Sequence, residues 1–181
     1  MATRNRIGIG SLVVVAACLL LAADQPKQPG EPLPHVQPPA ALERLKQLVG
    51  RWEGTEKTPE GEKKVAVEYR LTAAGTAVVE RLFPGQEHEM HSIYHGDGSQ
   101  VLMTHYCALG NQPRMRLEPT DDPKVLKFVF QDGTSMKSPN DPHMHQLTMT
   151  FEGEDRLTHE WVFFADGRPA NVVRFDLKRR K

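Results

Sequence analysis

Residues 145–163 read HQLTMTFEGEDRLTHEWVF, and this stretch decides the fold. Apolar and polar side chains alternate on both sides of the tripeptide GED, which predicts two β-strands joined by a loop at residues 153–155. Side chains alternate across a strand and opposed residues share a face, so the loop length sets the register. The expected pairs are Phe151 with Leu157, Met149 with His159, Leu147 with Trp161, and His145 with Phe163.

This register separates an apolar face from a polar one. The first face is apolar except for two histidines, His145 and His159. The second face is mostly polar and includes the pair Thr150 and Thr158. A slip of one residue would mix the two faces. We therefore expect His145, His159 and Trp161 on the buried, lumen-facing side of the sheet.

A second hairpin is expected near residues 88–107. A two-residue turn at Asp97-Gly98 would join its strands and turn His91 and His95 outward. The face opposite to these histidines is the more apolar one, so we expect it to be buried. Its members are Met90, Ser92, Tyr94, Val101, Met103, His105 and Cys107.

The rest of residues 40–181 has the same organisation. Apolar residues alternate over 65–71 and 126–130, and Gly-containing turn signals recur between such runs. Many short strands with polar turns predict an all-β domain, an antiparallel sandwich or barrel. Helical spacing occurs only at residues 40–49, where Gly50 would end the helix.

The N-terminus has the pattern of an export signal. Residues 1–23 combine Arg4 and Arg6 with an apolar run, which is typical of a secretory signal peptide. Residues 15–18 resemble a lipobox, so lipidation at Cys18, ordinary cleavage and an uncleaved anchor all stay open. Residues 24–39 are rich in proline and predict an extended tether. The sequence thus predicts an exported protein: periplasmic, envelope-anchored or secreted.

Composition excludes several functions. The chain of 181 residues carries 23 Lys+Arg and 23 Asp+Glu, without the basic excess that is typical of nucleic-acid binders. Two cysteines exclude a disulfide scaffold. No phosphate loop, dinucleotide fingerprint, nucleophile elbow or HExxH motif is present. An enzyme is therefore less expected than a binding protein, and no catalytic residue is assigned.

Two segments resemble known barrels. Gly50-Arg51-Trp52 follows the predicted helix and looks like the opening motif of lipocalin and calycin barrels. Residues 94–98 and 104–114 resemble an uncharacterised family of exported bacterial lipocalin-like domains, over about residues 45–178. This resemblance implies an up-and-down β-barrel with a short N-terminal helix. It also implies that Trp52 closes one end beneath a basic residue near the C-terminus, for which we expect Arg174, with Lys178 as the alternative.

The barrel would gather several polar groups in its lumen. Glu80 shares a face with Val78 and Leu82, so its carboxyl group needs a partner, for which Arg114 or Arg116 is available. The expected ligand-binding residues are His105, His145, His159, Trp161, Tyr94 and Glu80. The same three histidines are the candidates if a metal is bound. The cofactor and the oligomeric state stay open.

We therefore expect an exported lipocalin-like barrel that binds a small, largely apolar molecule. Affinity would come from burying the ligand and orientation from a few polar groups. Three alternatives stay open: a haem- or metal-binding barrel, an enzyme of unknown reaction, and a structural or partner-binding envelope domain.

Overall fold

The computed structural model describes residues 39–58 and 61–181. The predicted signal segment, Cys18 and nearly all of the predicted tether lie outside these residues. The described part contains one α-helix, one short 3₁₀ turn at Ala73–Gly75 and ten strands. The bounds are α1 (Ala40–Lys46), β1 (Gly50–Thr58), β2 (Gly61–Thr72), β3 (Ala77–Leu82), β4 (Met90–Asp97), β5 (Gln100–Tyr106), β6 (Gln112–Glu118), β7 (Val125–Thr134), β8 (His143–Phe151), β9 (Arg156–Ala165) and β10 (Arg168–Arg179).

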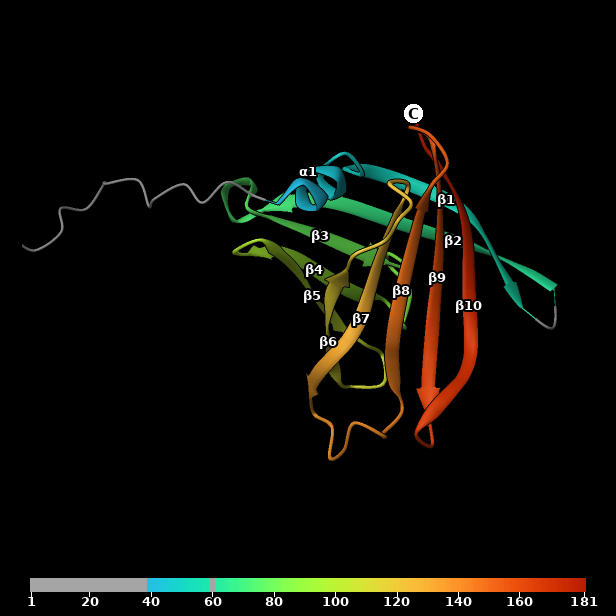
Figure 1. Cartoon of the computed structure of the whole chain (residues 1–181). Coiled ribbons are helices and arrows are strands. Elements are labelled where there is room, and N and C mark those ends of the chain that lie inside the picture. Colours follow the sequence, from blue (N-terminus) through green and yellow to red (C-terminus); the bar gives the residue numbers. More distant parts are fainter. Residues whose placement is uncertain (1–38, 59–60) are drawn as a thin grey trace, which may run out of the picture. The chain divides into compact units, whose positions relative to one another are not determined.

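The ten strands form a closed antiparallel barrel. Each strand pairs with the next one along the chain, and β1 pairs with β10 to close the sheet. This confirms the predicted all-β, up-and-down barrel preceded by a short helix. Figure 1 shows α1 at one end of the barrel, and the turns that follow β7 and β9 at the other.

A glycine permits the closing pair of strands. A Cβ atom at Gly54 would lie 1.8 Å from the carbonyl oxygen of Asp176, far inside contact distance. Gly54 therefore lets β1 approach β10 closely enough to complete the ladder. In that ladder Gly54 is opposite Leu177, and Trp52 is opposite Arg179.

The β8–β9 hairpin confirms most of the predicted register. Phe151 pairs with Leu157, Met149 with His159, and Leu147 with Trp161. The expected pair of His145 with Phe163 is wrong, because the register shifts between Met144 and Gln146. A β-bulge places an extra residue in one strand, and here Met144 pairs with Phe163 instead.

The β4–β5 hairpin has the predicted faces with a different turn. Asp97 pairs with Gln100, so the turn is formed by residues 98–99 and the register moves by two residues. Because the shift is even, the expected faces are retained. Tyr94 pairs with Met103, and Ser92 with His105, and all four side chains are buried.

The N-terminal helix is shorter than predicted. α1 ends at Lys46, and Gly50 begins β1 with a φ of 126° instead of capping the helix. Leu42, Leu45 and Leu48 are nevertheless buried, so the apolar stripe packs against the barrel as a helix face does. Within the described residues, no helix has the length and hydropathy needed to cross a membrane.

The end of the barrel near α1 is closed by Trp52. Its side chain is 1% exposed, and its indole N–H donates to Leu48 O at 2.8 Å. The guanidinium of Arg179 lies 4.3 Å from the ring centroid. The expectation of Arg174 above this ring is wrong. Residues 175, 177 and 179 of β10 face inward, whereas Arg174 faces outward and contacts Glu160 and Asp176.

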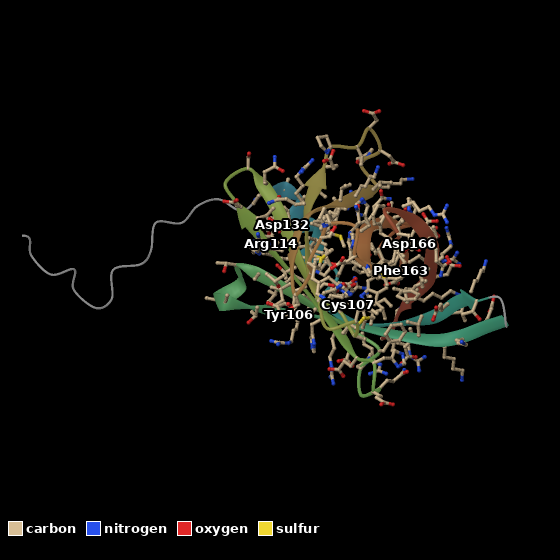
Figure 2. The ribbon with its side chains drawn as sticks, turned by 90° about the horizontal axis from the view of Figure 1, so that it is seen from below. Tyr106, Cys107, Arg114, Asp132, Phe163 and Asp166 are labelled. Carbon is tan, nitrogen blue, oxygen red and sulfur yellow. The ribbon has the colours of Figure 1, made fainter. Side chains whose placement is uncertain are left out.

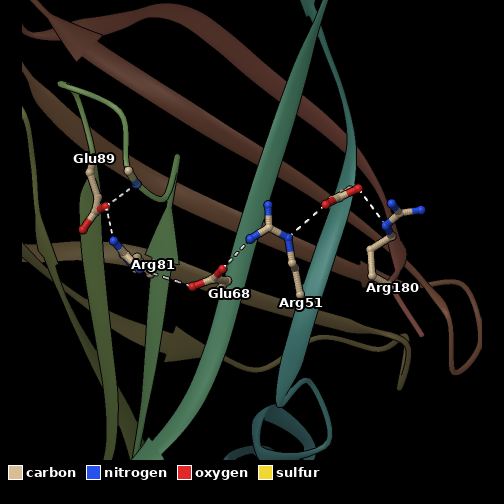
Figure 3. A network of polar contacts seen from close by, with 7 residues as sticks. Arg51, Glu68, Arg81, Glu89 and Arg180 are labelled. Carbon is tan, nitrogen blue, oxygen red and sulfur yellow. Dashed lines mark hydrogen bonds and ion pairs between the residues drawn. The ribbon is translucent and has the colours of Figure 1, made fainter.

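Charged residues on the outer face link β1, β2 and β3. Figure 3 shows a chain of ion pairs in which acids and bases alternate. It runs through Glu89, Arg81, Glu68, Arg51, Glu53 and Arg180. A shallow hollow of about 250 Å³ lies over this face. The guanidinium groups of Arg51 and Arg81 already contact carboxylates there, so we assign this region to the stability of the sheet.

Candidate ligand-binding site

Four strands place a row of polar side chains inside the barrel. Tyr69 in β2 is opposite Glu80 in β3, Glu80 is opposite Ser92 in β4, and Ser92 is opposite His105 in β5. All four side chains are buried. Buried polar groups are costly unless they form hydrogen bonds, so their partners decide what the row can do.

Glu80 is held by two tyrosines. Its carboxylate accepts hydrogen bonds from the hydroxyls of Tyr69 (2.7 Å) and Tyr94 (2.8 Å). Burial, followed by the nearby Glu80 charge, raises the pKa of both tyrosines well above the ordinary value, so both remain donors. The expected arginine partners were wrong: Arg114 pairs with Asp132 and Arg116 with Glu118, all outside the barrel.

His159 completes this cluster from β9. Its Nε2 lies 2.9 Å from the Tyr69 hydroxyl, which already donates to Glu80 and therefore accepts from His159. Its Nδ1 lies 3.6 Å from Glu80 Oε1 and has no hydrogen-bond partner within residues 39–58 and 61–181. Burial lowers the pKa of His159, although Glu80 opposes this shift. The buried cluster of Tyr69, Glu80, Tyr94 and His159 is thus a polar core behind the pocket described next.

A pocket of about 250 Å³ opens beside this cluster. Exposed His88 and half-buried Glu56 contribute polar groups to its wall, and deeply buried His105 and Trp161 also line it. The other side chains that line it are apolar: Leu82, Phe83, Met90, Met144, Val173 and Phe175. Such a combination of apolar walls with a few polar groups is typical of small-molecule sites.

His105 and Trp161 leave two buried nitrogen atoms without partners. Their rings lie 4.8 Å apart between centroids, and the side chains are 1% and 2% exposed. Neither His105 Nε2 nor Trp161 Nε1 has a hydrogen-bond partner in the described part of the protein. Burial lowers the pKa of His105 to about 4, so the imidazole is neutral at pH 7. The inner part of the pocket is therefore polar but uncharged.

His145 lies apart from this pocket. Its ring stacks on Phe164 at 4.4 Å and on Phe130 at 5.3 Å. His143 Nδ1 lies 2.6 Å from Asp141 O and donates to it, so its Nε2 accepts from His145 Nδ1 at 2.9 Å. The bulge in β8 explains the change, because Met144 takes the inward position that we expected for His145.

The structure therefore brings together only part of the expected site. His105 and Trp161 line the pocket, whereas Tyr94, Glu80 and His159 lie in the adjoining polar cluster. Among the described residues, no group of three or more His, Cys, Asp or Glu side chains is arranged to hold a metal ion. Cys107 is half-buried, and its pKa is raised by burial, which opposes thiolate formation. Figure 2 shows Cys107 beside Tyr106 at the end of β5.

Most of the apolar side chains that line the pocket were not predicted from the sequence. Phe83 and His88 belong to the β3–β4 connection, which the sequence marks only as a turn at Pro84-Gly85. Phe83 has a positive φ of 55° and is 8% exposed. The one sequence signal for this part of the pocket lining is a large aromatic residue directly before a Pro-Gly turn.

Comparison with known proteins supports the fold. No protein-family model matches this chain, and no curated protein matches it. Among solved structures, the barrel is similar to the crystal structure of Rv2717c from M. tuberculosis, with a TM-score of 0.55 and 17% identity. The match covers 78% of this chain and 98% of that chain. At this identity the likeness shows a shared β-barrel fold, and the function has to be inferred from the site.

Proposed function

We propose that this protein is a lipocalin-like barrel that binds a small, largely apolar molecule in the pocket beside His105 and Trp161. One observation carries the proposal: two buried nitrogens, which have no partner among the described residues, belong to side chains that line a mainly apolar pocket. A closed, fully packed core would leave such groups unpaired at a cost of about 1–3 kcal/mol each. A bound molecule would supply the missing partners.

The size and charge of the pocket narrow the ligand class. Its volume of about 250 Å³ is just below the usual range for drug-sized ligands, so the ligand is small. Six of the ten lining residues are apolar, and His105 is neutral, so burial of apolar surface supplies most of the affinity. We assign no reaction to this site.

The test uses aminoanthracene, a neutral dye whose fluorescence rises in apolar surroundings. We expect the wild-type protein to bind it and Val173→Phe, which fills the pocket, to weaken binding at least about tenfold. Val172→Phe is the matched control, because Val172 is the neighbouring residue in β10 and is 54% exposed. Equal binding by both variants would place the dye elsewhere and contradict the proposal.

Haem binding is the second candidate, favoured by His105. In the tautomer that leaves Nε2 unprotonated, with Nδ1 donating to Ser92 Oγ at 3.0 Å, His105 is a neutral imidazole of the form that ligates metals. Haem iron can be held by a single histidine of the protein, whereas a bare metal ion needs several protein ligands. The pocket would have to widen for a porphyrin, so this candidate ranks second. A Soret band in protein from its own host, lost in His105→Phe, would establish it.

Export is part of the proposal. The predicted signal over residues 1–23 supports a periplasmic, envelope-anchored or secreted barrel, with membrane contact limited to that N-terminal segment. The balanced charge disfavours a nucleic-acid partner. A small-molecule carrier in the cell envelope is the simplest role that unites the signal with the pocket.

A further inference from the structure

The pocket offers hydrogen-bond donors deep in the barrel. Trp161 Nε1–H can only donate. Ser92 is completely buried and its Oγ lies 3.0 Å from His105 Nδ1, and we assign the hydroxyl as the donor in this contact. The imidazole proton then resides on Nε2, the atom without a partner. Among the described residues, these two N–H groups on neighbouring rings have no acceptor.

The surroundings favour an uncharged acceptor. None of the described residues that line the pocket is Lys or Arg, whereas Glu56 contributes a carboxylate. The buried carboxylate of Glu80 lies opposite Ser92 in the next strand. His105 is neutral because burial lowers its pKa to about 4. An anionic ligand would meet negative charge and no Lys or Arg side chain among the described lining residues, which favours a neutral ligand over an anion.

We propose that the ligand is a neutral carbonyl compound, such as a ketone, aldehyde or amide, whose oxygen accepts hydrogen bonds from Trp161 Nε1–H and His105 Nε2–H. This inference rests on the proposed function, because it concerns the same pocket. It adds the polar group that the ligand must carry and the two side chains that recognise it. The apolar walls contact the remainder of the molecule.

Three probes of similar shape test the inference: α-tetralone, tetralin and the tetralin carboxylate. They share the two-ring frame and differ in a carbonyl oxygen, no polar group, or a negative charge. We expect calorimetric titration of the full chain to show α-tetralone binding about tenfold tighter than tetralin, since each hydrogen bond contributes modestly. The carboxylate is expected to bind more weakly than either.

Trp161→Phe keeps an aromatic ring and removes the N–H donor. We expect it to reduce the preference for the ketone to about threefold or less while tetralin binding is retained, which also shows that the variant is folded. Trp52→Phe, at the closed end, should keep the full preference. Equal affinity for ketone and hydrocarbon, or tighter binding of the carboxylate, would overturn this inference and leave the proposed function standing. Binding of none of the three would contradict both.

Discussion

The hydroxyl of Tyr94 donates a hydrogen bond to Glu80 at 2.8 Å, in the middle of a barrel where neither side chain is exposed. The Tyr69 hydroxyl occupies the other carboxylate oxygen. A buried carboxylate is tolerated when its oxygens accept hydrogen bonds, so the two tyrosines make Glu80 compatible with the core. The polar cluster is thus part of the structure that holds the pocket.

Tyr94→Phe tests this role. The substitution keeps the ring and removes one donor, which leaves Glu80 Oε2 without that bond, so we expect a loss of about 1–3 kcal/mol in the free energy of unfolding. Tyr106→Phe is the control. Tyr106 is 47% exposed, so this substitution should change the free energy of unfolding by nearly zero. Urea denaturation measures both. Equal stabilities would show that the bond to Glu80 contributes nothing.

Arg179 is expected to stabilise the closed end of the barrel. It stacks on Trp52 and donates to the carbonyl oxygens of Val49 (2.9 Å) and Gln47 (2.7 Å). Arg179→Met should therefore cost about 1–3 kcal/mol of unfolding free energy. Arg174→Met, which breaks half-exposed ion pairs, should cost less than about 1 kcal/mol. A larger loss for Arg174 than for Arg179 would contradict this assignment.

Stability should fall as the pH drops below about 6.5. The pKa of His105 is about 4 in the folded protein and about 6.5 in an unfolded chain, so between these values the unfolded state binds the proton more readily. The contribution of His105 to the free energy of unfolding is fully present above pH 6.5, and about 3 kcal/mol of it is lost by pH 4. The pKa of His145 and of His159 is lowered too, also chiefly by burial.

The measurement is urea denaturation at several pH values between 7.5 and 4. His105→Phe removes one of these titrations, so its stability should fall less steeply with acid than that of the wild type. Parallel curves for the two proteins would mean that His105 titrates normally, which a buried, neutral side chain would not.

The local pattern predicted much of this fold. Strict alternation over residues 65–71 and around the loop at 153–155 identified strands and their inward faces, because period two is a property of each strand alone. His105 and Trp161 were placed correctly on the inward face for that reason. The β4–β5 register differs from the predicted one by two residues. This even shift leaves the predicted faces unchanged, since only an odd shift exchanges them.

Other features depend on strands that are far apart in sequence. The partners of Glu80 come from β2, β4 and β9, and no local pattern joins these strands. Arg179 reaches Trp52 through the β1–β10 register, which the sequence does not contain as a periodicity. The bulge at His145 likewise arises from pairing with β9. These nonlocal contacts explain why the partner of Trp52 and the position of His145 were predicted wrongly.

Export can be tested in the host cell. Fractionation followed by immunoblotting should find the protein outside the cytoplasm, because residues 1–23 resemble a secretory signal. Labelling with palmitate that disappears in Cys18→Ala would identify a lipoprotein, whereas a shortened, unlabelled chain would indicate ordinary cleavage. Full-length protein confined to the cytosol would refute export.

Native mass spectrometry of protein purified from its own host tests the central claim most directly. We expect the wild-type protein to carry a noncovalent small-molecule adduct that dissociates on denaturation, and Val172→Phe to carry it as well. Val173→Phe, which fills the pocket, should be recovered folded and without the adduct. Wild-type protein recovered only in its ligand-free mass, or an adduct that is unaffected by Val173→Phe, would contradict a ligand site in the lumen beside His105 and Trp161.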